Sequence, residues 1–399
     1  MPENPSFQES PQAGPLFTGS FMLLLLVFFL GLCNMAVFFN FYDCLIRGGV
    51  EAKTAGLLLG LFPLTALIVR PFISPFIHPQ NALPWIACGT GGMILCLGGY
   101  AVASGAAFFG LLRALHGLAF VLMITAVIAR TVSVIHPEKS GMAFGIMSII
   151  NLLPFAVVPV LVEFGLSRGF SQASVYLSAM VSTAMVFPVL WLIGKSPSNV
   201  LHDEGKAKAV LSRREIMGSF RNPAILLALS LAAVSYFCFS IVFFFLKSYG
   251  PTIGIERVGP FFVFSTFAMI SVRLAASSLF DRWNKAWMCA GALVFVGLMF
   301  VLLESVRSPW SFYVSGGLLG LGWGIAMPVV MAIVFNMSAP RLRAFNTNML
   351  IEMVDLGYFL GPVLGGLIIA RYGYPVLFFF MSAVSIIFGL LALRLAGKV

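Results

Sequence analysis

Apolar stretches of about 20 residues recur from one end of this 399-residue chain to the other. A stretch of that length crosses a ~30 Å hydrocarbon core as an α-helix. The residues are 60% hydrophobic and only 10% charged, whereas a typical soluble domain is about 25% charged. A soluble fold lacks enough polar groups here to cover its apolar surface. The sequence therefore predicts an all-α membrane protein with several transmembrane helices.

Twelve transmembrane helices are predicted from these stretches. They are residues 17–42, 54–77, 83–103, 106–134, 141–164, 172–194, 223–249, 257–280, 285–305, 310–337, 344–370 and 374–394. The connections are short, which implies antiparallel neighbours, except for the polar and basic segment 195–222. We therefore predict a six-helix bundle over residues 1–194, a cytoplasmic linker over 195–222 and a second six-helix bundle over 223–399.

The basic residues predict the orientation of the chain, because cytoplasmic loops carry an excess of Lys and Arg. With the N-terminus inside, fourteen fall on the inner side: Arg130, Lys139, Lys195, Lys206, Lys208, Arg213, Arg214, Arg221, Arg282, Lys285, Arg341, Arg343, Arg394 and Lys398. Seven fall outside: Arg47, Lys53, Arg168, Lys247, Arg257, Arg307 and Arg371. Both termini are thus predicted to be cytoplasmic, in a multi-pass protein of the inner (cytoplasmic) membrane. The charge needs no nucleic-acid partner to explain it.

Other features exclude several kinds of chemistry. The N-terminal tail has no Lys or Arg, so it lacks the basic region of a cleaved signal peptide and the first helix is expected to be retained. The six cysteines show neither CxxC nor metal-ligand spacing, which favours buried thiols over disulfides or zinc. No GxxxxGK[ST] or HExxH occurs, so ATP is not the energy source and an enzyme is disfavoured. We expect no cofactor and no metal, and a monomer.

The two halves of the chain repeat each other. "RPFISPFIH" at 70–78 matches "RLAASSLFD" at 273–281 in the position of its arginine and of its final polar residue, at an offset of 203 residues. "AFGIMSIINLLPF" at 143–155 matches "AFNTNMLIEMVDL" at 344–356 at an offset of 201. Near-constant offsets predict a duplicated six-helix unit with both copies in one orientation, and a binding site at the midplane between them.

Four short motifs resemble those of the major facilitator superfamily, and the resemblance covers essentially the whole chain. "DRWNK" at 281–285 is similar to the family's loop motif G-x-x-x-D-R-x-G-R-R, whereas "SPFIHPQNA" at 74–82 has His78 in place of the acid. "LLRALHG" at 111–117 resembles the fourth-helix motif L-x-x-x-R-x-x-Q-G of drug-proton antiporters, with His116 in place of Gln. "GYFLGPVLGG" at 357–366 has the form of the antiporter motif G-x-x-x-G-P-x-x-G-G, but on the eleventh helix rather than the fifth. The resemblance implies the major facilitator fold of two pseudo-symmetric six-helix bundles.

Arg113 and His116 lie three residues apart in an almost wholly apolar helix and therefore share one face. An ionisable side chain near the bilayer centre costs at least ~2.5 kcal/mol, so its presence there requires a functional or structural explanation. A functional reason is that Arg113 holds an anionic group of a solute or couples to a proton-carrying acid, with His116 tuning that charge or titrating. The alternative is that Arg113 snorkels outward or pairs with a helix-end carbonyl.

Glu352 and Asp355 supply the opposite charge from one face of the eleventh helix. Desolvation at that depth favours the neutral carboxyl group, so such a group can load and release a proton as access alternates. Asp355, nearer the midplane, is the stronger candidate for proton coupling. The alternative is a structural acid bonded to neighbouring helices.

The remaining polar residues of the helices divide into two groups. Arg70 and Arg273 lie about one turn from the cytoplasmic ends, and we predict that they close an inner gate through Asp281 or helix-end carbonyls. Asn34, Asn151 and Tyr236 are predicted to line the cavity, because buried amides are costly unless partnered. Asp43, Glu163 and Glu304 lie at outer helix ends and are expected to be solvated.

These observations lead to one hypothesis and three alternatives. The leading hypothesis is a proton-coupled secondary transporter that exports a small amphipathic, anionic or zwitterionic organic solute, with the solute, protons and the lipid bilayer as its partners. Proton-coupled uptake of an organic anion would use the same Arg113 and Asp355. A membrane-embedded enzyme lacks its motifs, and a sensor lacks an attached soluble domain. Solute flux under an imposed pH gradient, and its direction, would separate these classes.

Overall fold

The computed structural model describes residues 16–136, 139–195, 213–275 and 283–398, and every regular element within them is a helix. The first half contains α1 (Gly19–Ala36), α2 (Phe41–Arg47), α3 (Ala52–Ile73), α4 (Ala82–Val102), α5 (Ala106–Val132), α6 (Ser140–Ser167), α7 (Gln172–Ala184) and α8 (Val186–Lys195). The second contains α9 (Arg213–Arg221), α10 (Pro223–Tyr249), α11 (Gly259–Ala275), α13 (Lys285–Ser305), α14 (Pro309–Met337) and α15 (Arg343–Ala392).

The helices account for twelve transmembrane passes. Ten helical stretches of the described chain are long and apolar enough to span a membrane. The stretch within α15 holds two passes, because Gly373 at φ +79° turns the chain back where the sequence predicts a loop. The 17-residue α11 is the twelfth pass. The predicted all-α membrane fold is confirmed, with α1 and α2 forming one pass and α7 and α8 another.

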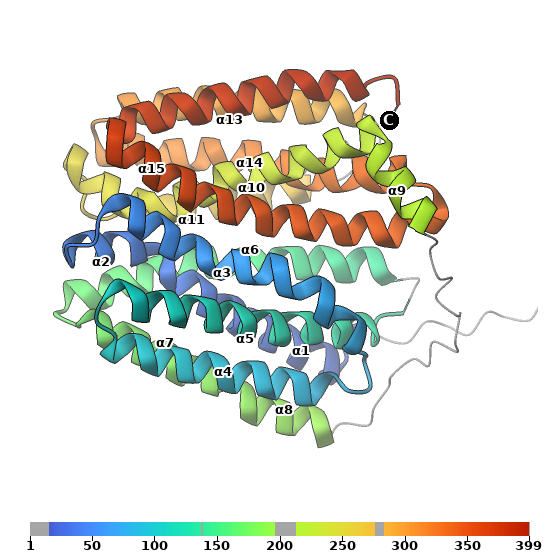
Figure 1. Ribbon diagram of the computed structural model, residues 1–399, viewed down its shortest axis with the longest axis horizontal. Coiled ribbons are helices and arrows are strands. Elements are labelled where there is room, and N and C mark those ends of the chain that lie inside the picture. Colours follow the sequence, from blue (N-terminus) through green and yellow to red (C-terminus); the bar gives the residue numbers. More distant parts are fainter. Residues whose placement is uncertain (1–15, 137–138, 196–212, 276–282, 399) are drawn as a thin grey trace, which may run out of the picture.

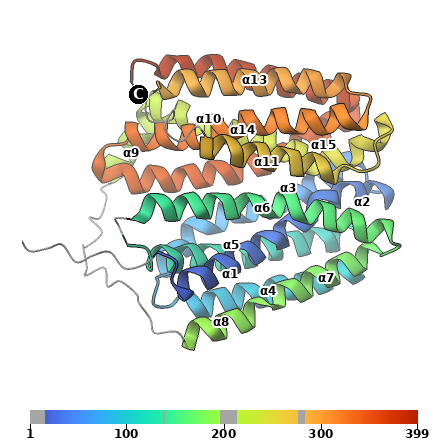
Figure 2. The ribbon, with the colours of Figure 1, turned by 180° about the vertical axis from the view of Figure 1, so that it is seen from behind.

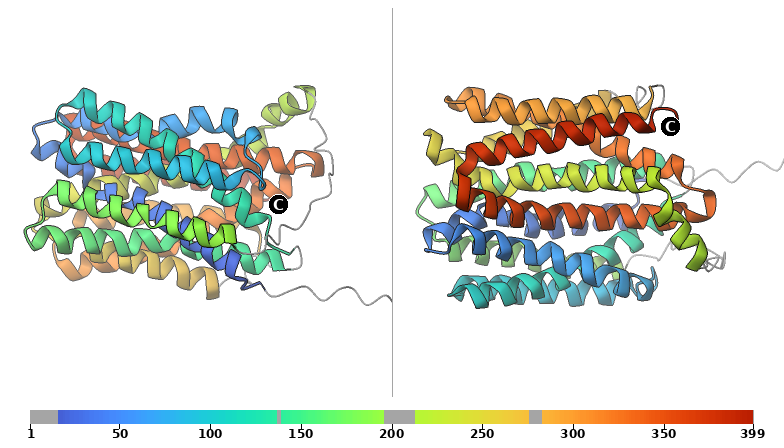
Figure 3. Two further views of the ribbon diagram at one scale, coloured as in Figure 1. Left: turned by 90° about the horizontal axis from the view of Figure 1, so that it is seen from below. Right: turned by 45° about the horizontal axis from the view of Figure 1, so that its top comes forward.

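The two halves of the chain form two groups of helices that lie side by side (Figure 1), and the view from behind shows the same division (Figure 2). All the long helices run roughly along one axis. α9 and the C-terminus lie at one end of the bundle (Figures 1 and 3), and we call this end the α9 end. The turn between α2 and α3 and the turn at Gly373 lie at the opposite end, which we call the outer end. The domain boundaries at 194/195 and 222/223 stay a prediction.

Two helix pairs make the most extensive contacts between the halves, and shorter contacts join α10 to α2 and to the 3₁₀ segment Val37–Asn40. α3 packs along α15, and α6 packs along α11. Near the outer end the first pair is very close: a Cβ placed on Gly56 would lie 2.4 Å from the Pro362 carbonyl oxygen, and one on Gly366 would lie 2.7 Å from the Ala52 carbonyl oxygen. The glycine-rich segment 357–366 therefore serves close helix packing, part of it directly across the two halves.

The largest apolar core continues across both halves. It joins Phe38, Phe39 and Phe41, on and beside the 3₁₀ segment Val37–Asn40, to Phe243 and Phe245 of α10. The rings of Tyr42 and Phe245 meet edge to face at 4.4 Å. Because this continuous core lies toward the outer end, the halves are held together there by apolar packing.

The predicted linker contains a helix that the sequence analysis did not identify. α9 docks on the first turn of α15 and on the segment before it. Ser219 donates a hydrogen bond to Asn346 Oδ1 of α15 at 2.7 Å, and Glu215 pairs with Arg341 at 3.1 Å. The other linker residues, 196–212, and the predicted gate residue Asp281 lie outside the described residues.

Candidate substrate and coupling site

A cavity of about 180 Å³ lies between the two halves, walled by α1, α3, α5 and α6 on one side and by α10 and α15 on the other. Eight of its lining side chains are aromatic. Six carry polar groups: Arg70, Arg113 and Asn151 from the first half, and Tyr236, Asp355 and Tyr358 from the second. An apolar cavity with a few convergent polar groups is the usual form of a small-molecule site.

Arg113 is held in the wall of this cavity by a proline and by aromatic rings. Pro63 lacks the N–H that would bond the Leu59 carbonyl four residues earlier, and the freed oxygen accepts a hydrogen bond from Arg113 Nη2 at 3.3 Å. The guanidinium carbon lies 4.8 Å from the ring centres of Phe38 and Phe62. The side chain is 2% exposed, so it does not snorkel. None of the ion pairs among the described residues involves it.

His116 and Asn34 lie behind that wall. Asn34 Nδ2 donates to Thr183 Oγ1 at 3.0 Å, which leaves Asn34 Oδ1 as the acceptor for His116 Nε2 at 2.5 Å. The imidazole ring packs edge-on against Phe38 and Phe62. The predicted neighbours Arg113 and His116 thus share their aromatic contacts. Of the five predicted substrate residues, Arg113, Asn151 and Tyr236 line the cavity, whereas His116 and Asn34 stand one layer away from it.

Arg70 and Asp355 form an ion pair that links the halves. Arg70 Nε and Nη2 donate to Asp355 Oδ2 at 3.0 and 2.7 Å, and the two side chains are 13% and 15% exposed. The sequence analysis assigned Arg70 to a gate and Asp355 to proton coupling, and the structure joins the two residues. Glu352 is buried and lies within electrostatic range of both, but outside the cavity lining. At the cavity wall, the positive charge of Arg70 therefore neutralises the negative charge of Asp355. The carboxyl group of Glu352 lies beside this pair.

Arg273 makes the corresponding connection between α11 and α6. Its Nη1 donates to the hydroxyl of Ser148 in the first half. Arg70 and Arg273, the equivalent residues of the sequence repeat, therefore each reach from the second helix of one half to a helix of the other half. Their partners here are Asp355 and Ser148, and the gate role of both residues stays a prediction.

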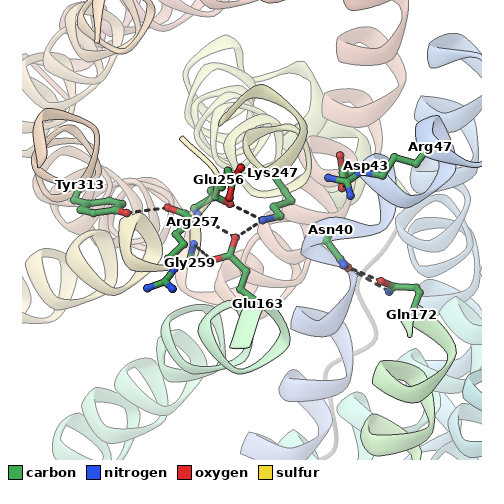
Figure 4. Close-up of polar contacts among 11 residues, drawn as sticks. Asn40, Asp43, Arg47, Glu163, Gln172, Lys247, Glu256, Arg257, Gly259 and Tyr313 are labelled. Carbon is green, nitrogen blue, oxygen red and sulfur yellow. Dashed lines mark hydrogen bonds and ion pairs between the residues drawn. The ribbon is translucent and has the colours of Figure 1, made fainter. Parts of the chain in front are cut away.

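At the outer end, Glu163 forms the most densely bonded contact between the halves (Figure 4). Its carboxylate pairs with Lys247 Nζ at 2.6 Å and accepts hydrogen bonds from the backbone N–H groups of Val258 and Gly259 at 2.9 and 2.7 Å. A carboxylate at the N-terminus of α11 also interacts favourably with the helix dipole. Lys247 donates in addition to the Glu256 carbonyl at 2.8 Å. The expectation that Glu163 is solvated is wrong, because its side chain is 10% exposed and fully engaged across the halves.

Figure 4 also shows bonds that support this region within each half. Tyr313 donates to the Arg257 carbonyl at 3.0 Å, and Asn40 Nδ2 donates to Gln172 Oε1 at 2.9 Å. We call the Glu163–Lys247 network together with the Gly56–Gly366 contact the outer clamp. The outer clamp joins the two halves at the outer end, and we expect it to close the cavity there.

Replacement of Glu163 by Gln is expected to weaken the outer clamp. The amide keeps the shape of the side chain but loses the charge that Lys247 and the α11 dipole require. A cysteine at Val354, which lines the cavity, should then react several-fold faster with an impermeant maleimide added at the outer face of a cysteine-free protein. Glu304→Gln is the matched control, because Glu304 pairs at 3.5 Å with Arg307 of its own half. Equal rates in Glu163→Gln and wild type would show that the network does not hold the outer end closed.

The fold and the cavity define a membrane transporter with one site between two helical bundles. The model of the Major Facilitator Superfamily matches residues 23–351 and 285–398. The chain belongs to the major facilitator superfamily, whose members are transporters and not enzymes, as the sequence analysis predicts.

Curated relatives and a solved structure agree with that assignment. Multidrug resistance protein MdtG of Citrobacter koseri is 26% identical over 351 residues, covering 81% of this chain and 80% of the relative. The multi-drug resistance efflux pump PmrA of Streptococcus pneumoniae is 24% identical over 362 residues, covering 86% and 87%. The crystal structure of the nucleoside transporter NupG superposes with a TM-score of 0.75 at 14% identity, over 96% of this chain and 100% of that chain, which shows the fold alone. The resemblance to the drug-proton antiporter branch is thereby confirmed.

Sequence reasoning missed three parts of this arrangement. It did not pair Arg70 with Asp355. It expected Glu163 to be solvated and counted Lys247 only among the basic residues of the outer side. It also passed over Tyr100 and Tyr176, which lie close to Arg113. For Glu163 and Lys247 a signal was present, since each is a lone charge within an apolar run of helix, and their opposite signs at equivalent depth fit a pair.

Proposed function

We propose that this protein is a proton-coupled exporter of a small amphipathic organic solute that carries an anionic group. The observation that supports it most is the Arg70–Asp355 ion pair at the wall of a cavity that Arg113 also lines. Arg113 forms no ion pair with any acid in the described part of the chain. The aromatic lining suits the apolar part of an amphipath, and the fixed charge of Arg113 suits its anionic part.

The ion pair supplies the coupling step. Protonation of Asp355 removes its charge and with it the attraction to Arg70. Asp355 lies 12 residues from the start of α15, about 18 Å from the α9 end at 1.5 Å per residue. The pair thus ties the halves on the α9 side of the cavity. Its loss eases opening toward the α9 end, and its formation favours opening toward the outer end.

The excess of basic residues in the loops at the α9 end supports a cytoplasmic position for that end. A proton taken up from outside then favours the cytoplasm-facing state. Its release to the cytoplasm restores the pair, and the solute that has bound near Arg113 leaves when the outer end opens. MdtG and PmrA are named as multidrug resistance and efflux proteins, which supports export over uptake.

Replacement of Arg113 by Ala is expected to weaken binding of anionic solutes roughly 10- to 100-fold, since a charge-assisted hydrogen bond contributes about 1.5–3 kcal/mol. The fold should survive, because Arg113 makes a single hydrogen bond and no ion pair among the described residues. The measurement is uptake of a panel of labelled organic anions into inside-out vesicles with an imposed pH gradient. Arg113→Lys, which keeps the charge, is the control. If Arg113→Ala binds and transports every anion as wild type does, the charge is structural and the proposal is wrong.

A further inference from the structure

Three hydrogen-bond donors of the first half converge on one buried place without a partner. They are the hydroxyl groups of Tyr100 on α4 and Tyr176 on α7, and the Nε–H of Arg113 on α5. All three side chains are 3% exposed or less. An unpartnered buried donor costs about 1–3 kcal/mol, more if charged. Three of them beside each other point to a missing acceptor.

The donors are gathered around one ring, that of Phe38. The Phe38 ring centre lies 4.9 Å from that of Tyr100 and 5.5 Å from that of Tyr176, on which it stacks. The Arg113 guanidinium carbon lies 4.8 Å from the same ring centre. Both hydroxyl groups are close enough to the guanidinium to interact with it electrostatically. The three side chains are therefore grouped around the Phe38 ring.

The chemistry of these groups selects an anion. Tyrosine hydroxyls and a guanidinium donate hydrogen bonds, and a carboxylate offers two oxygens with about four acceptor positions. A water molecule would satisfy the hydrogen bonds but would leave the charge of Arg113 unbalanced. A cation would be repelled. The nearby His116 donates through its Nε2 to Asn34 Oδ1. Its Nδ1, which also lacks a partner among the described residues, is then an acceptor in the neutral ring and not a further donor.

Phe38 also occupies a position that can move. It lies on the 3₁₀ segment Val37–Asn40 that interrupts the first transmembrane pass, and a 3₁₀ stretch within a long helix often marks a hinge. Phe38 and Arg113 line the central cavity, whereas Tyr100 and Tyr176 do not. A group entering from the cavity reaches the tyrosines by passing between Phe38 and Arg113.

We propose that Tyr100 and Tyr176 complete, with Arg113, a subsite for the carboxylate of an aromatic or other apolar solute, and that Phe38 forms its movable wall. This inference rests on the proposed function only in that the cavity receives a solute. It requires neither proton coupling nor export. It narrows the solute class to organic carboxylates.

The test uses purified full-length protein and two matched probes, benzoate and its neutral analogue benzamide. Wild type should bind benzoate more tightly than benzamide in calorimetric titration. Tyr100→Phe and Tyr176→Phe should each weaken the binding of benzoate roughly 3- to 10-fold, the range expected for one hydrogen bond. The affinity for benzamide should stay unchanged. Tyr372→Phe, at an exposed tyrosine, should change neither.

A second measurement separates binding from a structural role. Because the two hydroxyls lack a partner in the protein, their removal should leave the melting temperature of the ligand-free protein unchanged or raised. Benzoate binding equal to wild type in both variants, or a wild type that does not prefer benzoate at millimolar concentration, would overturn the subsite. Loss of pH-driven flux with the benzoate preference intact would instead refute proton coupling and leave the subsite standing.

Discussion

Asp355→Asn is expected to abolish solute transport driven by a pH gradient while sparing exchange of solute for solute. The amide has nearly the same shape as the carboxylate but neither carries the exchangeable proton nor pairs with Arg70, which now contacts it through two charge-assisted hydrogen bonds. The measurement compares gradient-driven accumulation with equilibrium exchange of the same labelled anion in proteoliposomes.

The matched control is Asp43→Asn. Asp43 forms its ion pair with Arg47 one helical turn away and within the same half, so its neutralisation should leave both kinds of transport near wild type. Residual pH-driven accumulation in Asp355→Asn would assign the proton to another group. Glu352, which lies within electrostatic range of Arg70 and Asp355, would then be the first candidate. Tyr358 and Tyr236, whose rings lie 5.8 Å apart, are the other titratable groups at this wall.

Gly56→Ala is expected to force the outer end open. An alanine methyl group at Gly56 would lie 2.4 Å from the Pro362 carbonyl oxygen and 3.0 Å from Gly366 Cα, both in the opposite half. Real Cβ atoms essentially never come so close, and the obstacle is rigid backbone. The three atoms nearest to the methyl group all belong to the opposite half, so the variant should fold and shift the population toward states with a separated outer end.

Gly91→Ala is the control for this variant, because Gly91 is a helical glycine of α4 with open space where the Cβ would go. An impermeant maleimide at the outer face should label the cysteine of Val354→Cys many-fold faster in the Gly56→Ala background and unchanged in the Gly91→Ala background. A variant at Gly56 that folds and labels at the wild-type rate would mean that the α3–α15 contact already separates in the resting protein.

The sequence predicted the twelve passes well because lipid imposes a length and a composition on each helix, independent of its neighbours. It also predicted that Arg113 and His116 share a face, since that follows from helical geometry alone. The turn at Gly373 coincides with the loop predicted between residues 370 and 374.

Contacts between the halves could not be predicted in this way, because they depend on how neighbouring helices pack. Arg70 and Asp355 are 285 positions apart, and their meeting depends on how α3 crosses α15. The prediction of a gate at Arg70 and the expectation of a solvated Glu163 each considered only the position of the residue on its own helix. Pro63 was visible in the sequence, but its consequence for Arg113 required the packing of α5 on α3.

The most direct test of the central claim, that the protonation state of Asp355 sets which end opens, needs no solute. Spin labels at Ser104 and Ser305, exposed outer-end positions on the two halves, report the separation of the outer ends by pulsed electron paramagnetic resonance in a cysteine-free protein. Wild type should gain a long-distance population as the pH rises, because the Arg70–Asp355 pair then forms and favours outward opening, whereas Asp355→Asn should keep the short distance at every pH. A wild type that does not respond to pH, or an Asp355→Asn variant that responds as wild type does, would contradict the claim.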